Sequence, residues 1–177
     1  MFIIKCTSIF GVFITTFFIG YLLSKKYTAR TVELKQIQIA LDILENKIRY
    51  TYEPIKEIFL EITKLIDGNI SILFENIAKN LEKQNIEEST ETALKEIKIN
   101  ITKEDIEVLH NLSKLLGKTD KEGQISQIEL AKTFLKTQIN KAEKEEEKNA
   151  KLYKTLGATM GLAFAIILIY SLFWRNT

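Results

Sequence analysis

Few residues of this chain could do chemistry, and they do not form a catalytic set. The sequence holds a single histidine, His110, which lies between Leu109 and Leu112 on a predicted helix. Metal sites need several ligands, and activated nucleophiles need a base with its own partner. We interpret His110 as a surface or hydrogen-bonded packing residue. The sequence therefore predicts no catalytic residue, no metal ligand and no enzymatic activity.

The other reactive groups support the same interpretation. Cys6 is the single cysteine, so an internal disulfide is impossible, and we favour a packing thiol over an acylation site. Asp42 and Glu45 are the best carboxylate pair, but helical carboxylates at that spacing usually face solvent or pair with Lys and Arg. A catalytic role would require a pocket that raises their pKa values.

Cofactor and nucleic-acid binding are also not expected. The seven glycines form no phosphate-binding run, and no G-x-x-x-x-G-K motif is present. If nucleotide hydrolysis powers this protein, a partner performs it. The chain has 25 Lys and Arg against 23 Asp and Glu, mixed along its middle, so no strongly basic face suggests nucleic acid.

Two apolar stretches at the ends of the chain must position whatever lies between them. Phe2 to Leu23 and Leu156 to Trp174 are each long enough to cross a bilayer as a helix. We predict an N-terminal anchor at 1–24, a helical bundle with membrane-proximal necks at 25–154, a second transmembrane helix at 155–174 and a tail at 175–177. A cleaved signal peptide is the alternative for the first stretch, but Tyr21 to Ser24 offers no pair of small residues for cleavage.

The basic residues near the predicted spans indicate an orientation. Only Lys5 and Arg175 lie on the outer sides of the two spans, and all the other nearby basic residues flank the middle segment: Lys25, Lys26, Arg30, Lys144, Lys148, Lys151 and Lys154. The positive-inside rule therefore predicts a cytoplasmic bundle in the cell membrane, with both termini on the opposite side.

The middle segment has the periodicity of an all-α bundle of about six helices. Apolar residues recur every three or four positions, and those predicted to form the core are Leu34, Ile37, Leu41, Leu44, Ile48, Ile58, Ile62, Phe74, Ile77, Leu109, Leu112, Leu116, Ile128 and Leu135. The predicted helices after the first begin at Pro54, Ser71, Thr90, Thr102 and Asp120. The last continues into the second span without a proline.

Local signals predict where these helices begin and end. The first ends near Tyr50 because Pro54 disfavours helical geometry before it and suits the first position of the next helix. Gly68 and Gly117 are predicted C-terminal caps. Thr102 to Asp105 resembles a capping box, and Asp120 is a predicted N-cap.

Two further segments carry structural hypotheses. Residues 143–151 are polar almost all round, and we prefer to interpret them as a solvated part of the last helix. Because residues 24–33 are polar and of similar length, an antiparallel neck between bundle and bilayer is the alternative hypothesis. Gly157 and Gly161 form a G-x-x-x-G motif that permits close helix packing, either with the first span or with a neighbouring subunit.

Several of these features, in order, resemble the stage III sporulation protein AB family of endospore-forming bacteria. The resemblance covers nearly the whole chain and is carried by an anchor followed by basic residues and then by Leu34, Leu41, Leu44, Glu45, Ile48, Tyr50, Pro54, Ile55, Leu116, Gly117, Asp120, Gln124, Lys154, Leu156, Gly157 and Gly161. Glu53 departs from the Thr expected before Pro54, which puts the local cap in doubt.

The resemblance implies a platform or scaffold in the secretion-like channel between mother cell and forespore. The family is similar to the platform protein of type II secretion and type IV pilus systems, whose cytoplasmic domains are six-helix bundles. The implied partners are a cytoplasmic secretion-type ATPase, similar to stage III sporulation protein AA, and other channel membrane proteins. The implied location is the mother-cell membrane around the forespore, with self-association left open.

Two other functions remain as alternatives. The chain could be a platform subunit of another secretion or pilus system. It could also be a helical membrane sensor, although such receptors place their input domain outside the cell, against the charge rule.

Overall fold

The computed structural model describes the backbone of residues 2–174. Side chains are described over the same range, except at positions 2–10, 12, 13, 16, 17, 23, 150, 154, 164, 165 and 168–174. The interpretations given for Lys5, Cys6 and Arg175 therefore lie outside the described side chains.

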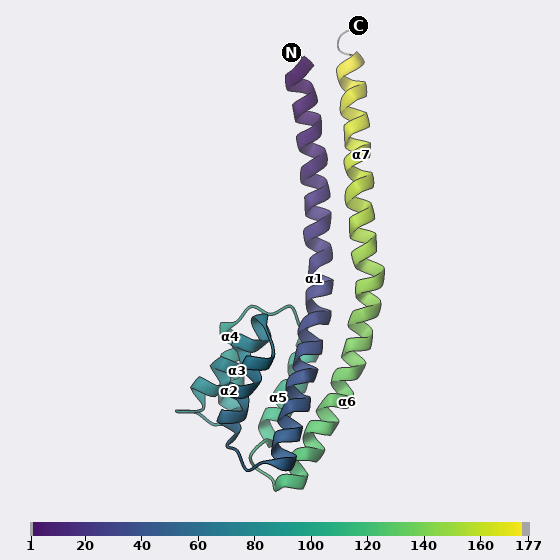
Figure 1. The fold of residues 1–177 in the computed structure, drawn as a ribbon. Helices are drawn as coiled ribbons and strands as arrows, with labels where there is room; N and C mark the ends of the chain where they lie inside the picture. The colour runs from purple at the N-terminus through teal and green to yellow at the C-terminus, as the bar shows by residue number, and fades with distance from the viewer. Residues whose placement is uncertain (1, 175–177) are drawn as a thin grey trace. The chain divides into compact units, whose positions relative to one another are not determined.

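The described residues form helices joined by loops, which confirms the all-α part of the predicted fold class and leaves the two transmembrane helices as a prediction. Residues 2–174 contain no strand, and the elements in order are α1 (Phe2–Tyr50), α2 (Ile55–Leu65), α3 (Gly68–Asn80), α4 (Ile86–Glu96), α5 (Lys103–Leu115), α6 (Lys121–Glu145), the π-helix η1 (Glu146–Ala150) and α7 (Lys151–Trp174) (Figure 1). The chain divides into two compact units. One is the bundle unit, Arg30–Ala142, and the other, here called the terminal unit, joins the residues before and after it.

The bundle unit contains the second half of α1, the helices α2 to α5 and most of α6, in agreement with the predicted number of about six helices. Consecutive helices from α2 to α5 pack against one another. One apolar cluster joins the six, because each helix contributes a stripe at helical spacing. Phe59 of α2 and Phe74 of α3 meet edge to face within it, with ring centroids 5.4 Å apart.

The helix boundaries follow the local signals with some shifts. Thr102 and Asp105 form the predicted capping box of α5, and Asp120 accepts a hydrogen bond from the Gly123 N–H at 2.9 Å at the start of α6. Pro54 lies one position before the first residue of α2.

Gly68 was predicted to cap the C-terminus of the second helix, and this prediction was wrong. Gly68 has a φ of +69°, but α2 has already ended at Leu65 and Gly68 is the first residue of α3. The third helix thus begins three residues earlier than its apolar stripe indicated, because the backbone turns at Gly68 and helical geometry follows at once. Helix α4 also begins earlier than predicted, where Asn85 accepts a hydrogen bond from the Glu88 N–H.

The terminal unit pairs the first half of α1 with α7. The rings of Tyr27 and Tyr153 stack with centroids 5.9 Å apart. Gly20 lies so close to α7 that a Cβ added to it would be 2.6 Å from the carbonyl oxygen of Tyr153 and 3.0 Å from the Cα of Gly157. Within the described part of the chain, no helix meets the length and apolarity needed to cross a membrane.

Candidate functional site

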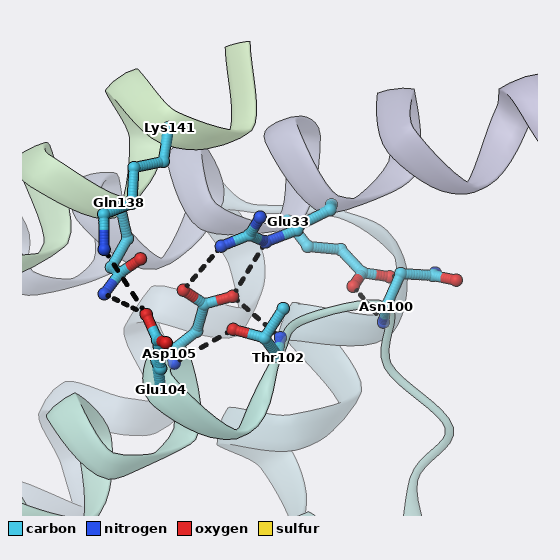
Figure 2. Close-up of polar contacts among 8 residues, drawn as sticks. Glu33, Asn100, Thr102, Glu104, Asp105, Gln138 and Lys141 are labelled. Carbon is cyan, nitrogen blue, oxygen red and sulfur yellow. Dashed lines mark hydrogen bonds and ion pairs between the residues drawn. The ribbon is translucent and has the colours of Figure 1, made fainter. Parts of the chain in front are cut away.

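A buried ion pair joins α1 to α5 in the bundle unit. The Arg30 guanidinium donates two hydrogen bonds to the Asp105 carboxylate, from Nε at 3.0 Å and from the second nitrogen at 3.1 Å (Figure 2). The Asp105 side chain is fully buried and the Arg30 side chain is 9% exposed. Two parallel hydrogen bonds between charged groups fix the orientation of both partners.

The start of α5 explains why Asp105 is in place to receive Arg30. Asp105 is the third residue of the helix, where its carboxylate accepts a hydrogen bond from the Thr102 N–H at 2.7 Å. Burial raises the pKa of Asp105, but hydrogen bonds from Arg30 and Thr102 outweigh that effect and hold the pKa below its usual range. Asp105 therefore remains a carboxylate that serves both the helix cap and the ion pair.

Glu33, one turn further along α1, makes a second buried polar contact. Its carboxylate accepts hydrogen bonds from the Asn100 backbone N–H at 2.5 Å, the Asn100 side chain at 2.9 Å and the Asn69 side chain at 3.0 Å. Figure 2 shows Glu33 and Asn100 beside the ion pair. Glu33 is thus held by the loop before α5 and by the first turn of α3, and α1 is attached at two neighbouring positions.

A row of charges joins α1 to α6 farther along the bundle. The Lys132 Nζ atom lies 2.5 Å from Oδ1 of Asp42 and 2.8 Å from Oε2 of Glu45. The Arg49 Nη2 atom lies 2.7 Å from Oε1 of Glu45 and 3.0 Å from Oε1 of Glu129. Hydrogen bonds from Lys132 and then from Arg49 lower the pKa of Glu45. Asp42 and Glu45 are therefore ion-pair partners, and the lowered pKa of Glu45 makes it a poor general acid.

The turn between α5 and α6 brings together three residues that carried the family resemblance. Gly117 adopts a φ of +78°. The Gln124 side chain accepts a hydrogen bond from the Gly117 N–H at 3.3 Å and donates one to the Thr119 carbonyl at 3.1 Å. With Asp120 as the cap of α6, these residues define the path of the turn.

The remaining residues singled out from the sequence occupy different environments. Thirteen of the fourteen residues predicted for the core are at most 6% exposed, and Ile48 is half-buried against the same cluster. Tyr50 is 77% exposed, and Pro54 is exposed beside it. Gly157 lies against Gly20, and Gly161 is buried on α7.

Three residues that the sequence analysis did not connect come together on α4 and α5. The ligand atoms of Glu87, Glu91 and His110 all lie within 4.8 Å of one another. The four-residue spacing of the two glutamates was a signal that they share a helix face. The partners Arg30 and Asp105 were also missed as a pair, since 75 residues separate them and no local pattern connects them.

Comparison with known proteins gives consistent matches over most of the chain. A model of the family described as stage III sporulation protein AB matches residues 5–169. The protein named stage III sporulation protein AB from Bacillus subtilis (strain 168) is 31% identical over 160 residues, which cover 88% of this chain and 94% of that relative. A solved structure of a stage III sporulation protein AB matches with a TM-score of 0.64 and 27% identity, and the match covers 68% of this chain and 98% of that structure.

Proposed function

This chain belongs to the stage III sporulation protein AB family, and we propose that it is a membrane platform of the secretion-like channel between mother cell and forespore. Its link to sporulation follows from that membership. The proposal adds a mechanical role, in which the bundle unit binds a cytoplasmic secretion-type ATPase and passes a movement to helices that contact other channel proteins.

The buried ion pair between Arg30 and Asp105 is the observation that carries this proposal. A platform that transmits force needs the helix that carries the movement to be fixed to the rest of the bundle, so that both move together. Arg30 and Glu33 attach α1 to α5, α3 and the loop before α5 through buried hydrogen bonds. Helix α1 extends without a break from Phe2 to Tyr50, so its buried contacts and its apolar first half belong to one helix.

The chain's apolar ends support membrane anchoring. We propose that Phe2 to Leu23 and Leu156 to Trp174 are two spans, with a bundle on the cytoplasmic side in the mother-cell membrane around the forespore. The basic residues Lys25, Lys26, Lys144 and Lys148 support this orientation. The close approach of Gly20 to Gly157 supports pairing of the two spans within one chain.

The charge pattern supports a binding role in place of catalysis. Hydrogen bonds from Lys and Arg side chains lower the pKa of Glu45 and Glu82, and they outweigh burial to lower the pKa of Asp105. A general acid at neutral pH needs the opposite shift. These three carboxylates are therefore poor general acids, and in the proposed mechanism the partner ATPase hydrolyses the nucleotide.

The loop between α1 and α2 is the surface we propose for the ATPase. Tyr50 and Tyr52 are 77% and 99% exposed, and Tyr is enriched where proteins bind one another. Lys121 of α6 lies over the Tyr52 ring at 5.7 Å from its centroid. Tyr50 is the last residue of α1 and Tyr52 follows it in the loop, so both lie at the opposite end of α1 from its apolar N-terminal half.

Co-purification with the ATPase tests the proposal. The full chain in detergent micelles is expected to retain the stage III sporulation protein AA-like ATPase, and the double substitution Tyr50→Ser with Tyr52→Ser is expected to reduce retention at least tenfold. Leu65→Ser, which changes an apolar residue that is 59% exposed on α2, is the matched control and should retain the ATPase. Failure of the unaltered chain to bind the ATPase would contradict the platform role.

A further inference from the structure

Two carboxylates and an imidazole converge on the surface formed by α4 and α5. Glu87 and Glu91 are one turn apart on α4, and His110 is on α5. The His110 Nδ1 atom lies 3.4 Å from a Glu91 carboxylate oxygen, and the ligand atoms of all three residues lie within 4.8 Å of one another. All three side chains are partly buried, with exposures of 30%, 44% and 27% for Glu87, Glu91 and His110.

The core fixes the two helices that carry these ligands. Ala93 of α4 is fully buried, and Leu109 of α5, next to His110, is 6% exposed. Helix α4 begins at the Asn85 cap and α5 begins at the Thr102 capping box. Because the ligands project from packed helices, their spacing is set before any ion arrives, which favours binding.

Two lysines also contact the carboxylates. The Lys118 Nζ atom is 3.2 Å from Glu87, and the Lys95 Nζ atom is 3.9 Å from Glu91. Their side chains are 57% and 79% exposed, and such exposed ion pairs contribute little to stability. A divalent cation can therefore displace them, and each lysine can extend into solvent.

We propose that Glu87, Glu91 and His110 bind a divalent transition-metal ion of the zinc class and thereby join α4 to α5. One imidazole nitrogen with two carboxylate oxygens suits Zn²⁺, whereas Ca²⁺ takes six to eight oxygen ligands. Three protein ligands leave a fourth position of a tetrahedral Zn²⁺ ion for water. This site goes beyond the proposed platform function and does not depend on it.

Zinc titration of the full chain in detergent tests the proposal. With any affinity tag removed, isothermal titration with Zn²⁺ alone should give one ion per chain. His110→Ala and Glu91→Gln should each weaken Zn²⁺ binding by at least about tenfold, as the loss of a ligand should cost no less than the loss of an outer-shell partner. Glu88→Gln is the matched control, since Glu88 is exposed on the same helix and outside the cluster.

A further variant separates a metal site from a surface ion pair. Lys118→Met removes the cation beside Glu87 and should tighten Zn²⁺ binding several-fold. Circular dichroism of each variant establishes that the helical fold is kept. Equal Zn²⁺ affinity in the unaltered chain and in folded His110→Ala, or no Zn²⁺ binding by the unaltered chain, would overturn the proposal and leave an ion pair only.

Discussion

The buried carboxylate of Asp105 has two tasks, and each involves a different part of the chain. It completes the cap of α5 through Thr102 and it holds the guanidinium of Arg30. Breaking a buried ion pair by removing one charge costs about 3 to 5 kcal/mol, since the other charge stays in a poorly solvated site. Asp105 is therefore the residue through which the attachment of α1 can be tested most directly.

Asp105→Asn is expected to lower the free energy of unfolding by about 3 kcal/mol. The amide keeps the shape of the side chain but removes the charge beside the guanidinium. Urea unfolding followed by far-ultraviolet circular dichroism measures the change. Glu104→Gln is the control: its side chain is 69% exposed and pairs with Lys141 at 3.4 Å, so a loss below about 0.5 kcal/mol is expected. If both variants lost the same free energy of unfolding, the buried ion pair would stabilise the fold no more than an exposed one does.

The same residue predicts how stability depends on pH. A carboxyl group whose pKa is lower in the folded state binds fewer protons there than in the unfolded state. Its stabilisation is present above the unfolded pKa, about 4, and is lost as the pH falls through the folded pKa. The pKa values of Asp105 and Glu45 are both lowered.

We therefore expect the free energy of unfolding to fall as the pH is taken from about 5 to 3. The fall should be less steep in Asp105→Asn, which lacks one of the carboxyl groups whose pKa is lowered in the folded state. Urea unfolding at a series of pH values gives both slopes. Parallel slopes would exclude Asp105 as a source of the acid sensitivity.

Local chemistry made some of these residues predictable. Thr102, Asp105 and Asp120 are caps because their oxygens reach backbone N–H groups only a few residues away, and such patterns can be read from the sequence. The partners of Glu33 and the approach of Glu87 to His110 depend on how separate helices pack. No short-range pattern specifies those distances, so they required the structure.

Two helix connections in the bundle depend on a glycine in left-handed geometry. Gly68 and Gly117 have φ values of +69° and +78°. At Gly68 an added Cβ would meet no atom within 4 Å, whereas at Gly117 it would lie 3.2 Å from Cδ1 of Ile86. A side chain at either position would therefore have the same unfavourable backbone conformation, but only at Gly117 would it also meet a neighbouring atom.

We expect Gly68→Ala to cost about 1 kcal/mol from backbone geometry and Gly117→Ala to cost more, about 1.5 to 2 kcal/mol. Thermal or urea unfolding of the two variants measures the difference. A larger loss at Gly68 than at Gly117 would contradict the assigned contact with Ile86.

The pairing of α1 with α7 depends on the absence of a side chain at Gly20. Gly20→Ala should force the helices apart, because the new Cβ would lie 2.6 Å from the Tyr153 carbonyl oxygen. A short bis-maleimide joining Tyr27→Cys to Tyr153→Cys, in a Cys6→Ser background, reports their proximity. Gly11→Ala is the control, since a Cβ there would meet no atom within 4 Å. Unchanged crosslinking in Gly20→Ala would contradict the close approach.

Helix identity was predictable at this scale, and some helix limits were not. Apolar stripes of period 3.6 indicated the bundle helices correctly, because each must bury one face. The starts of α3 and α4 were placed too late, because Ile70 in the first turn of α3 and Ile86 at the start of α4 belong to the apolar stripes and were not included in them. On α1, Gly20 and Ser24 have the same four-residue spacing of small residues as Gly157 and Gly161, and this was the signal for Gly20 that went unused.

At the scale of the whole molecule, the division into two units predicts that the bundle unit is independent. Residues 30–142 contain the whole of the large apolar cluster formed by described side chains, and they contain the buried polar contacts of Arg30 and Glu33. Expressed alone, this segment is expected to be helical and to unfold cooperatively in urea. A shorter segment, 37–142, lacks Arg30, Glu33 and the fully buried Leu34, and should be less stable by several kcal/mol from the lost ion pair and the lost core residue together. A gradual transition for 30–142 would contradict its independence.

The helical bundle was predictable in outline, because six amphipathic stripes must bury their apolar faces against one another. The π-helix η1 at Glu146–Ala150 was not, since the residues around it are polar on nearly every face and give no periodic signal. The boundary of the bundle unit at Arg30 also could not be read from the sequence, because the mostly polar stretch at residues 24–33 has no turn or helix-ending signal there.

The contact between Gly20 and Gly157 also has a consequence for how the protein is made. Its two helices lie near opposite ends of the chain, and a ribosome adds roughly 5 to 20 residues per second. The first half of α1 therefore exists for on the order of ten seconds before α7 has been synthesised. During this interval the face of α1 around Gly20 lacks the helix that it later packs against in the same chain, so the contact between the two helices can form only after nearly all of the chain has been made.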